Sequence, residues 1–245
     1  MRARFEAEGD VIVVTGGANG IGLALARAAA QAGARVIVCD VDAAAMAALS
    51  DVPGIAARRL DVSDRAQVFA TLAAVEREFG RIDGLVCAAA VQPRSVVHQM
   101  DPAEWDRVLR INLSGVVWCY QAVIAGMIAR RSGSIVAFTS GLAHQGWPGA
   151  SAYAASKAAL IAFAKSAAKE IAPHRVRFNL IARGVIVTVQ YREANAGADD
   201  ARWRASVGVG QPEDAVGPLL FLLSEQATMT ASIISRDFAY PAQDA

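Results

Sequence analysis

The sequence predicts an α/β fold: a single domain, residues 1–245, with a doubly wound parallel sheet of about seven strands and helices on both faces. Short apolar, β-branched runs alternate with Ala- and Leu-rich runs, as expected where crossover helices join parallel strands. The strand-like runs lack polar alternation, which is typical of strands buried on both faces. No internal repeat or interdomain linker divides the chain, so one large domain is expected.

A glycine-rich turn joins the first expected strand, Val11–Val14, to the first expected helix, Leu23–Gln31. A second strand, Arg35–Cys39, follows and ends at Asp40. Glycines let backbone N–H groups approach a pyrophosphate, the helix N-terminus adds a positive dipole end, and the acid accepts hydrogen bonds from ribose hydroxyls. The pattern predicts a Rossmann-type cofactor site with contacts from Gly16, Asn19, Gly20, Ile21, Gly22 and Asp40.

The residues of this unit also indicate which dinucleotide binds. No Arg or Lys occurs from Thr15 to Gly22, and Val41 follows Asp40, so nothing here offers to bind a 2′-phosphate. Asp40 would repel one. The sequence therefore predicts NAD(H) as the cofactor rather than NADP(H).

The alternation of strands and helices continues to the end of the chain. Further strands are expected at Ile55–Leu60, Leu85–Ala88, Ser134–Phe138, Val176–Ile181 and Ser232–Phe238. Helices are expected from Ser63 to Phe79, from Asp101 through Asn112, from Tyr153 to Ile171, and from Pro212 to Leu223.

Open parallel sheets bind ligands beyond the carboxyl ends of their strands. Asp61 and Val62 follow the third strand, where they can meet the adenine, and the small side chains of Ala88 and Ala89 leave room for the cofactor. Ser140 follows the fifth strand. The segment between Ser140 and Tyr153 contains three glycines and a proline, and is expected to be a loop that brings the hydroxyl beside the phenol.

Tyr153 and Lys157 are four residues apart in a run free of Gly and Pro, so both lie on one face of a helix, within reach of a shared ligand. A lysine on an otherwise apolar face needs a partner or a task, because burying an ammonium is costly. A nearby cation favours the phenolate and suits a proton-transfer tyrosine. A partly exposed Tyr with a snorkelling Lys is the alternative from this pair alone.

Composition excludes some classes of function. The formal charge is +1 and no basic block occurs, so nucleic-acid binding is not expected and the ligand is expected to be a small molecule. The cysteines Cys39, Cys87 and Cys119 lack metal-type spacing and indicate reduced thiols in a cytoplasmic protein. No metal is expected. The N-terminus lacks a secretory pattern.

Two longer segments need separate interpretation. Ile111–Ala129 carries no charge, but its polar residues favour a core or subunit-interface helix over a membrane span. From Thr188 to Val207 the sequence is irregular and polar, which favours a lid over a pocket.

Together these segments resemble the short-chain dehydrogenase/reductase family, from about Val11 to Phe238. The family's T-G-x-x-x-G-x-G turn matches Thr15–Gly22 and its Y-x-x-x-K pair matches Tyr153 and Lys157. The resemblance implies a catalytic tetrad: Asn112, Ser140, Tyr153 and Lys157. Tyr153 would then be the general acid/base and Ser140 would polarise the substrate oxygen. Lys157 would hold the nicotinamide ribose, and Asn112 would anchor a water in a proton relay.

The resemblance also extends the expected contacts. Further cofactor contacts are expected from Gly184, Ile186 and Thr188, besides Tyr153 and Lys157, and substrate contacts from Gln92, Leu142, His144, Val185 and Tyr191. A homo-oligomer is implied, a tetramer by analogy.

Three segments depart from the family pattern. Cys87–Ala90 replaces N-N-A-G, Asp237–Ala239 replaces Asp-Gly-Gly, and Arg183 replaces the proline of Pro-Gly. Arg183 could contact the pyrophosphate or an anionic substrate group, or be a solvated loop residue.

The leading hypothesis is an NAD(H)-dependent oxidoreductase that interconverts a secondary alcohol or polyol and its ketone. Two alternatives stay open. A 3-oxoacyl-thioester reductase would share the fold and tetrad, and a non-catalytic NAD(H)-binding scaffold or sensor would share the cofactor site.

Overall fold

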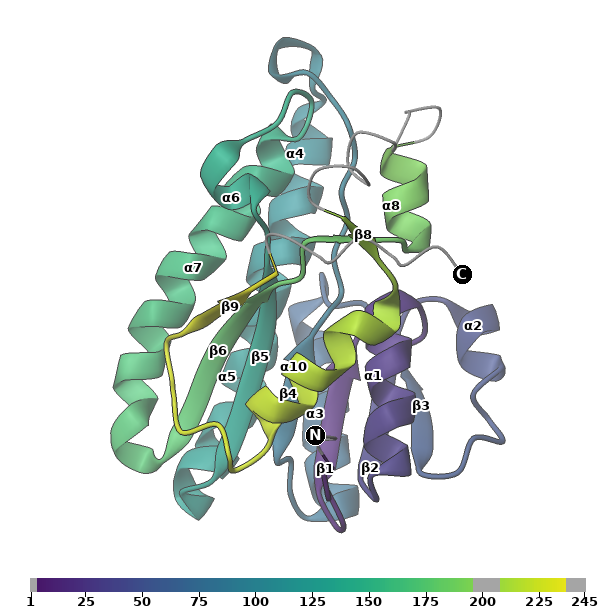
Figure 1. The fold of residues 1–245 in the computed structure, drawn as a ribbon, viewed down its shortest axis with the longest axis vertical. Coiled ribbons are helices and arrows are strands. Elements are labelled where there is room, and N and C mark those ends of the chain that lie inside the picture. Colours follow the sequence, from purple (N-terminus) through teal and green to yellow (C-terminus); the bar gives the residue numbers. More distant parts are fainter. Residues whose placement is uncertain (1–3, 196–207, 237–245) are drawn as a thin grey trace.

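The structure, a computed structural model, describes residues 4–195 and 208–236, and its centre is a seven-stranded parallel sheet (Figure 1). The strand order is β3-β2-β1-β4-β5-β6-β9. The strands are β1 Val11–Thr15, β2 Arg35–Asp40, β3 Ile55–Arg59, β4 Gly84–Cys87, β5 Gly133–Thr139, β6 Val176–Ala182 and β9 Ile233–Ser235. The expected single-domain, doubly wound fold is confirmed. The order reverses between β1 and β4, where such sheets bind ligands.

Helices cover both faces of the sheet and bury two separate hydrophobic cores (Figure 1). One face carries α1 Gly20–Gln31 and α10 Val216–Leu223, whose apolar residues share a core with Ile12 and Val14. The other carries α3 Arg65–Phe79, α5 Gly115–Arg130 and α7 Ser151–Ile171, which pack with Val11 and Val13. Successive residues of β1 thus enter opposite cores, as the period of a strand requires.

The long apolar helical segment Pro102–Arg130 has the length and composition of a membrane span. It consists of α4 Pro102–Leu109, a π-helical turn at Arg110–Ser114, and α5. Val116, Cys119, Val123 and Met127 of α5 lie in the core, so this segment packs as a core helix.

The three cysteines are buried free thiols, and burial raises the pKa of Cys39 to about 12.

Several short elements differ from the sequence expectation. The expected loop before Tyr153 contains α6 Leu142–Gln145, and the expected irregular lid begins with α8 Val189–Ala194. The helix expected from Pro212 starts as a 3-10 turn, Pro212–Ala215. Elements that were not expected are α2 Ala43–Ala47, the two-residue strands β7 Val185–Ile186 and β8 Val209–Gly210, and 3-10 turns at Val97–Gln99 and Ala172–His174. Such short elements carry too few residues to show a hydrophobic period. The remaining lid residues, 196–207, and the last two residues of the final expected strand lie outside the described residues.

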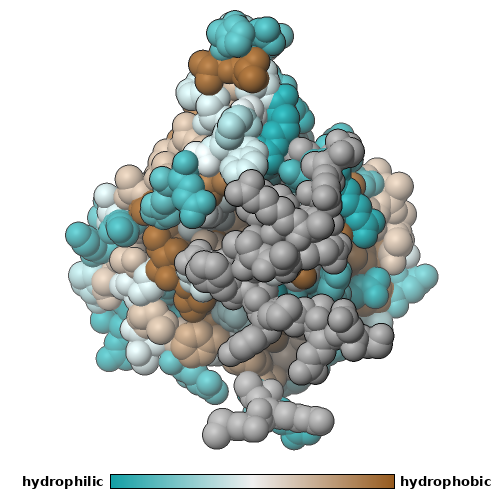
Figure 2. All heavy atoms as spheres, turned by 45° about the horizontal axis from the view of Figure 1, so that its top comes forward, coloured by the Kyte–Doolittle hydropathy of each residue, from teal (hydrophilic) through white to brown (hydrophobic). Residues whose placement is uncertain are grey.

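The loop between β4 and α4 projects from the body of the molecule. Val96 and Val97 in this loop are exposed. Figure 2 shows hydrophobic residues beside hydrophilic ones near the projecting end of the molecule. The preceding residues, 91–95, are half-buried. The loop therefore turns only its base toward the sheet.

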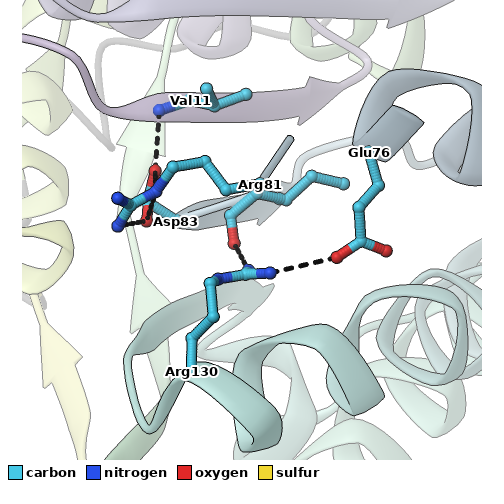
Figure 3. Close-up of polar contacts among 6 residues, drawn as sticks. Val11, Glu76, Arg81, Asp83 and Arg130 are labelled. Carbon is cyan, nitrogen blue, oxygen red and sulfur yellow. Dashed lines mark hydrogen bonds and ion pairs between the residues drawn. The ribbon is translucent and has the colours of Figure 1, made fainter. Parts of the chain in front are cut away.

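The amino-terminal edge of the sheet carries a network of charged side chains (Figure 3). Asp83 accepts a hydrogen bond from the backbone N–H of Val11 at 3.0 Å and pairs with Arg81. Arg130, at the end of α5, pairs with Glu76 of α3 at 3.1 Å and donates to the carbonyl of Ile82 at 2.8 Å. These contacts join β1, β4, α3 and α5 at the edge remote from the glycine turn.

Candidate active site

A cleft of about 810 Å³ opens at the carboxyl-terminal edge of the sheet. It runs from the ends of β2 and β3, over β1 and β4, to α7 and the start of α8. Thirteen residues expected to bind the cofactor line it: Gly16, Asn19, Gly20, Ile21, Gly22, Asp40, Asp61, Val62, Ala88, Ala89, Tyr153, Lys157 and Thr188. Gly184 and Ile186, also expected there, are not among its lining residues.

The glycine turn after β1 is tightly packed. A Cβ at Gly16 would lie 2.5 Å from the backbone nitrogen of Ala89, and Gly16 has a φ of +65°. Gly20 begins α1, and a Cβ there would lie 3.2 Å from the Thr188 methyl group. The turn thus brings backbone and the first N–H groups of α1 to the floor of the cleft, an arrangement that fits the pyrophosphate of a dinucleotide.

Two carboxylates lie beside this turn at one end of the cleft. Asp40 accepts hydrogen bonds from the backbone N–H groups of Ala18 at 3.0 Å and Val41 at 2.8 Å. Asp42 caps α2 and accepts from the Asn19 amide at 3.2 Å. The Ala45 N–H, together with that amide, lowers the pKa of Asp42. This end of the cleft is therefore anionic, although Arg59, the register neighbour of Asp40 on β3, also lines it.

Tyr153 and Lys157 lie at the other end, both on the buried side of α7. The exposed fractions are 5% for Tyr153 and 2% for Lys157, so the snorkelling alternative is excluded. Lys157 Nζ donates to the carbonyl of Phe138 at 2.9 Å and lies 5.6 Å from the centroid of the Tyr153 ring. Burial, and secondarily the charge of Arg183, lowers the Lys157 pKa to about 7. An ammonium is thus held next to the phenol at a cost in free energy.

Ser140 directly follows β5 and is half-buried. Its Oγ accepts a hydrogen bond from the backbone N–H of Leu142 at 3.2 Å. The preceding residue, Thr139, donates its hydroxyl to the carbonyl of Lys157 at 3.1 Å. The end of β5 is therefore tied to α7, which fixes Ser140 relative to the helix that carries Tyr153.

Asn112 lies in the π-helical turn, and its side chain is fully buried. Its amide accepts from the N–H of Val91 at 2.8 Å and donates to the Val91 carbonyl at 2.9 Å. It also donates to Ser156 Oγ at 3.2 Å, which in turn donates to the carbonyl of Tyr153 at 2.7 Å. The Asn112 side chain thus braces the loop after β4 against α7. A water relay at Asn112 would have to use its backbone, because the side chain is engaged.

The chain matches a known protein family. The sequence model of the family described as short chain dehydrogenase matches residues 10–199. The protein belongs to the short-chain dehydrogenase family. It is therefore an oxidoreductase of a family that binds a nicotinamide dinucleotide and acts on small-molecule substrates.

Individual relatives of this dehydrogenase cover nearly its whole length. It is 34% identical to 2-(S)-hydroxypropyl-CoM dehydrogenase 3 of Xanthobacter autotrophicus, over 89% of this chain and 91% of the relative. It is 36% identical to the 3-oxoacyl-[acyl-carrier-protein] reductase FabG of Thermotoga maritima, over 94% and 97%. The crystal structure of gox2181 superposes with a TM-score of 0.88 at 34% identity, covering 94% of this chain and 95% of that chain.

The side chains expected to bind substrate lie outside the cleft lining. Gln92 and Leu142 are half-buried, and His144 is exposed on α6. Val185 belongs to β7, and Tyr191 lies on α8, its backbone N–H donating to Thr188 Oγ1 at 3.1 Å. None of these five is among the lining residues: Gln92 belongs to the loop after β4, Leu142 and His144 to α6 after Ser140, and Val185 and Tyr191 to the segments on either side of Thr188.

Other residues line the cleft without having been expected there. They are Val41, Asp42, Arg59, Leu60, Ser63, Arg107, Ile111, Phe138, Val189 and Glu193. Several are immediate neighbours of expected residues in the sequence. Arg59, Arg107 and Glu193 are not, and only the fold shows that they line the cleft. Arg183, for which the sequence left a contact with the pyrophosphate or an anionic substrate group open, also lines the cleft, as do Ala90 and Val91 in the segment after Ala89. In the ranges 4–195 and 208–236 of this dehydrogenase, no group of three or more His, Cys, Asp or Glu could hold a metal ion.

Proposed function

We propose that this dehydrogenase interconverts a secondary alcohol, a polyol included, and its ketone with NAD(H). The observation that carries the proposal is that Tyr153 and Lys157 line the same cleft as the glycine turn. When bound, the dinucleotide supplies or accepts the hydride. Tyr153 Oη gives a proton to the ketone oxygen in reduction and takes it from the alcohol in oxidation. Ser140 Oγ orients that oxygen, and the Lys157 ammonium stabilises negative charge on the phenol.

The preference for NAD(H) is part of the proposal. Asp40 and Asp42 lie side by side where a 2′-phosphate would add two further negative charges. The exposed guanidinium of Arg59, the register neighbour of Asp40 on β3, opposes them. Two carboxylates beside the solvated cation of Arg59 favour the cofactor without the phosphate.

The similarity to the Thermotoga maritima reductase supports a second candidate, a 3-oxoacyl-thioester reductase. Both candidates use a secondary alcohol and ketone, so they differ in substrate and not in chemistry. The scaffold alternative predicts NADH binding without turnover. Its support is weakened by the burial of Tyr153 and Lys157, a costly arrangement for a site without chemistry.

A homo-oligomer, a tetramer by family resemblance, and a cytoplasmic location complete the proposal. Sedimentation of the purified protein tests the first, since a monomer would contradict it.

The deciding experiment is a fluorescence titration with NADH and NADPH, followed by assays of NAD reduction with cyclic, aromatic and polyhydroxylated alcohols and of ketone and 3-oxoacyl-thioester reduction. Turnover with an NADH preference supports the main proposal. Turnover restricted to thioesters supports the second candidate. NADH binding with no turnover of any compound supports the scaffold.

A further inference from the structure

Arg183 is a cation on the cleft wall that the proposed chemistry does not use. It is half-buried, which excludes a freely solvated loop arginine. Within the described parts of the chain it makes no hydrogen bond or ion pair, and its charge disfavours the ammonium of Lys157. Two cations facing one cleft repel each other, and an anion between them would relieve that repulsion.

The position of Arg183 separates it from the pyrophosphate end of the cleft. It directly follows β6, which lies three strands from β1 in the sheet, or about 14 Å at the usual strand spacing. The glycine turn follows β1. The chain then crosses from Arg183 to Thr188, whose methyl group approaches Gly20. Thr188 therefore serves the cofactor turn, whereas Arg183 lies at the substrate end beside Lys157.

A second guanidinium, that of Arg94, approaches the catalytic tyrosine from the loop after β4. Asn112 holds this loop at Val91, and the backbone N–H of Ser95 donates to the Gly149 carbonyl at 2.9 Å. Between these two fixed points, Arg94 is half-buried and donates to Asn195 Oδ1 at 3.3 Å, just after α8. Burial lowers the Arg94 pKa, whereas interaction with Tyr153 raises it. Arg94 therefore lies close enough to Tyr153 for their charges to interact, although it is not among the residues that line the cleft.

We propose that the substrate of this dehydrogenase is a hydroxy acid, whose carboxylate is bound by Arg183 and Arg94 while its hydroxyl meets Tyr153. The proposal rests on the proposed alcohol–ketone function and narrows its substrate class. A guanidinium can donate two parallel hydrogen bonds to a carboxylate, a geometry that lysine lacks. The carboxylate would also neutralise the repulsion between Arg183 and Lys157.

The test compares matched acids and amides that cannot react, so that it does not depend on turnover. Cyclohexanecarboxylate and cyclohexanecarboxamide, and butyrate and butyramide, are titrated calorimetrically into the full-length protein, with and without saturating NADH. The parent protein should bind each acid at least about tenfold more tightly than its amide. Arg183→Met and Arg94→Gln should each reduce that ratio severalfold. Arg35→Met, which removes an exposed charge at the opposite edge of the sheet, should leave it unchanged.

Equal binding of acids and amides by the parent protein would overturn the inference. So would an acid preference that survives both arginine substitutions in variants whose circular dichroism matches the parent. Failure of the underlying function looks different: it is a protein that turns over neither hydroxy acids nor neutral alcohols. Turnover of neutral alcohols or methyl esters, but not of the free hydroxy acids, would support the alcohol–ketone function and contradict the hydroxy-acid substrate class.

Discussion

The two edges of the central sheet differ in whether their charged side chains are paired. At the amino-terminal edge, Arg130 pairs with Glu76, and Arg81 pairs with Asp83 (Figure 3). At the carboxyl-terminal edge, Lys157 is buried against a carbonyl and repelled by Arg183. At the first edge, the charged side chains pair with one another and connect strands to helices. At the second edge, Lys157 and Arg183 make no ion pair among the described residues, and burying the Lys157 ammonium there lowers stability. We propose that ligands are the partners of these two cations.

The largest test of this contrast removes the reacting hydroxyl. Tyr153→Phe should lower kcat by about 10²–10⁴-fold, because the proton has no other donor at that position. NADH affinity should stay within about twofold, since the ring and Lys157 remain. Steady-state rates and an NADH titration check both expectations. Tyr120→Phe, which removes the hydroxyl of another buried tyrosine, on α5 and outside the cleft lining, is the control and should keep parent rates. A Tyr153→Phe protein with near-parent turnover would remove Tyr153 from the mechanism.

The second test asks whether the carboxyl-terminal edge truly lowers stability. The Lys157 pKa, about 7 in the folded protein, lies below the ordinary value of 10.5. Below pH 7 both folded and unfolded states carry the charge, and folding bears the full burial penalty. Between pH 7 and 10.5 only the unfolded state holds the proton, so stability rises with pH. Lys157→Met should therefore raise the free energy of unfolding on the order of 3 kcal/mol at pH 6, and less at pH 9.

Urea unfolding at the two pH values measures this difference. Lys165→Met, which replaces an exposed lysine on the same helix, should change stability by less than about 0.5 kcal/mol at either pH. A gain from Lys157→Met that is equal at pH 6 and pH 9 would show that lost charge burial is not its cause. Turnover of Lys157→Met should fall in any case, which separates stability from function at one residue.

The third test removes a paired charge at the amino-terminal edge of the sheet. Arg130→Met should lower the free energy of unfolding by about 1–2 kcal/mol, because it leaves the Ile82 carbonyl and Glu76 without their charged donor. Its kcat should equal that of the parent at temperatures well below unfolding. Arg77→Met, at an exposed position of α3, should alter neither quantity and serves as the matched control. A loss of activity without a loss of stability would mean that the two edges are coupled.

Sequence patterns revealed the parts of the molecule that depend on local spacing. Runs of β-branched residues placed β2 and β6 to within one residue, and the glycine turn and the Tyr153–Lys157 pair lie where their spacing predicted. Strands β7 and β8, two residues each, were missed because they have no period to detect.

Contacts between distant segments were not visible in the sequence. Asn112 braces Val91, 21 residues away, and this use of the amide follows only from the fold. Arg183 stood out as a departure, but whether it was solvated or enclosed depended on how β6 meets α7. Arg94 gave no local signal at all, since its significance comes from the packing of its loop beside Gly149.

The smallest expected effect concerns cofactor affinity at the carboxyl-terminal edge, where carboxylates lie at the β2 end of the cleft and cations at the β6 end. Asp40→Asn removes one negative charge and keeps one oxygen, which can accept from the N–H of Ala18 or of Val41 but not from both, because these groups donate to different oxygens of Asp40. The ratio of NADPH to NADH dissociation constants should therefore fall about tenfold, or about 1.4 kcal/mol. Asp42→Asn, more exposed and shared with Asn19, should shift that ratio in the same direction by less. Fluorescence titrations with both cofactors measure it at constant salt, because screening weakens exposed charges. If neither substitution moves the ratio, the charges of Asp40 and Asp42 do not set the cofactor preference, and the proposed electrostatic basis for NAD(H) selection is wrong.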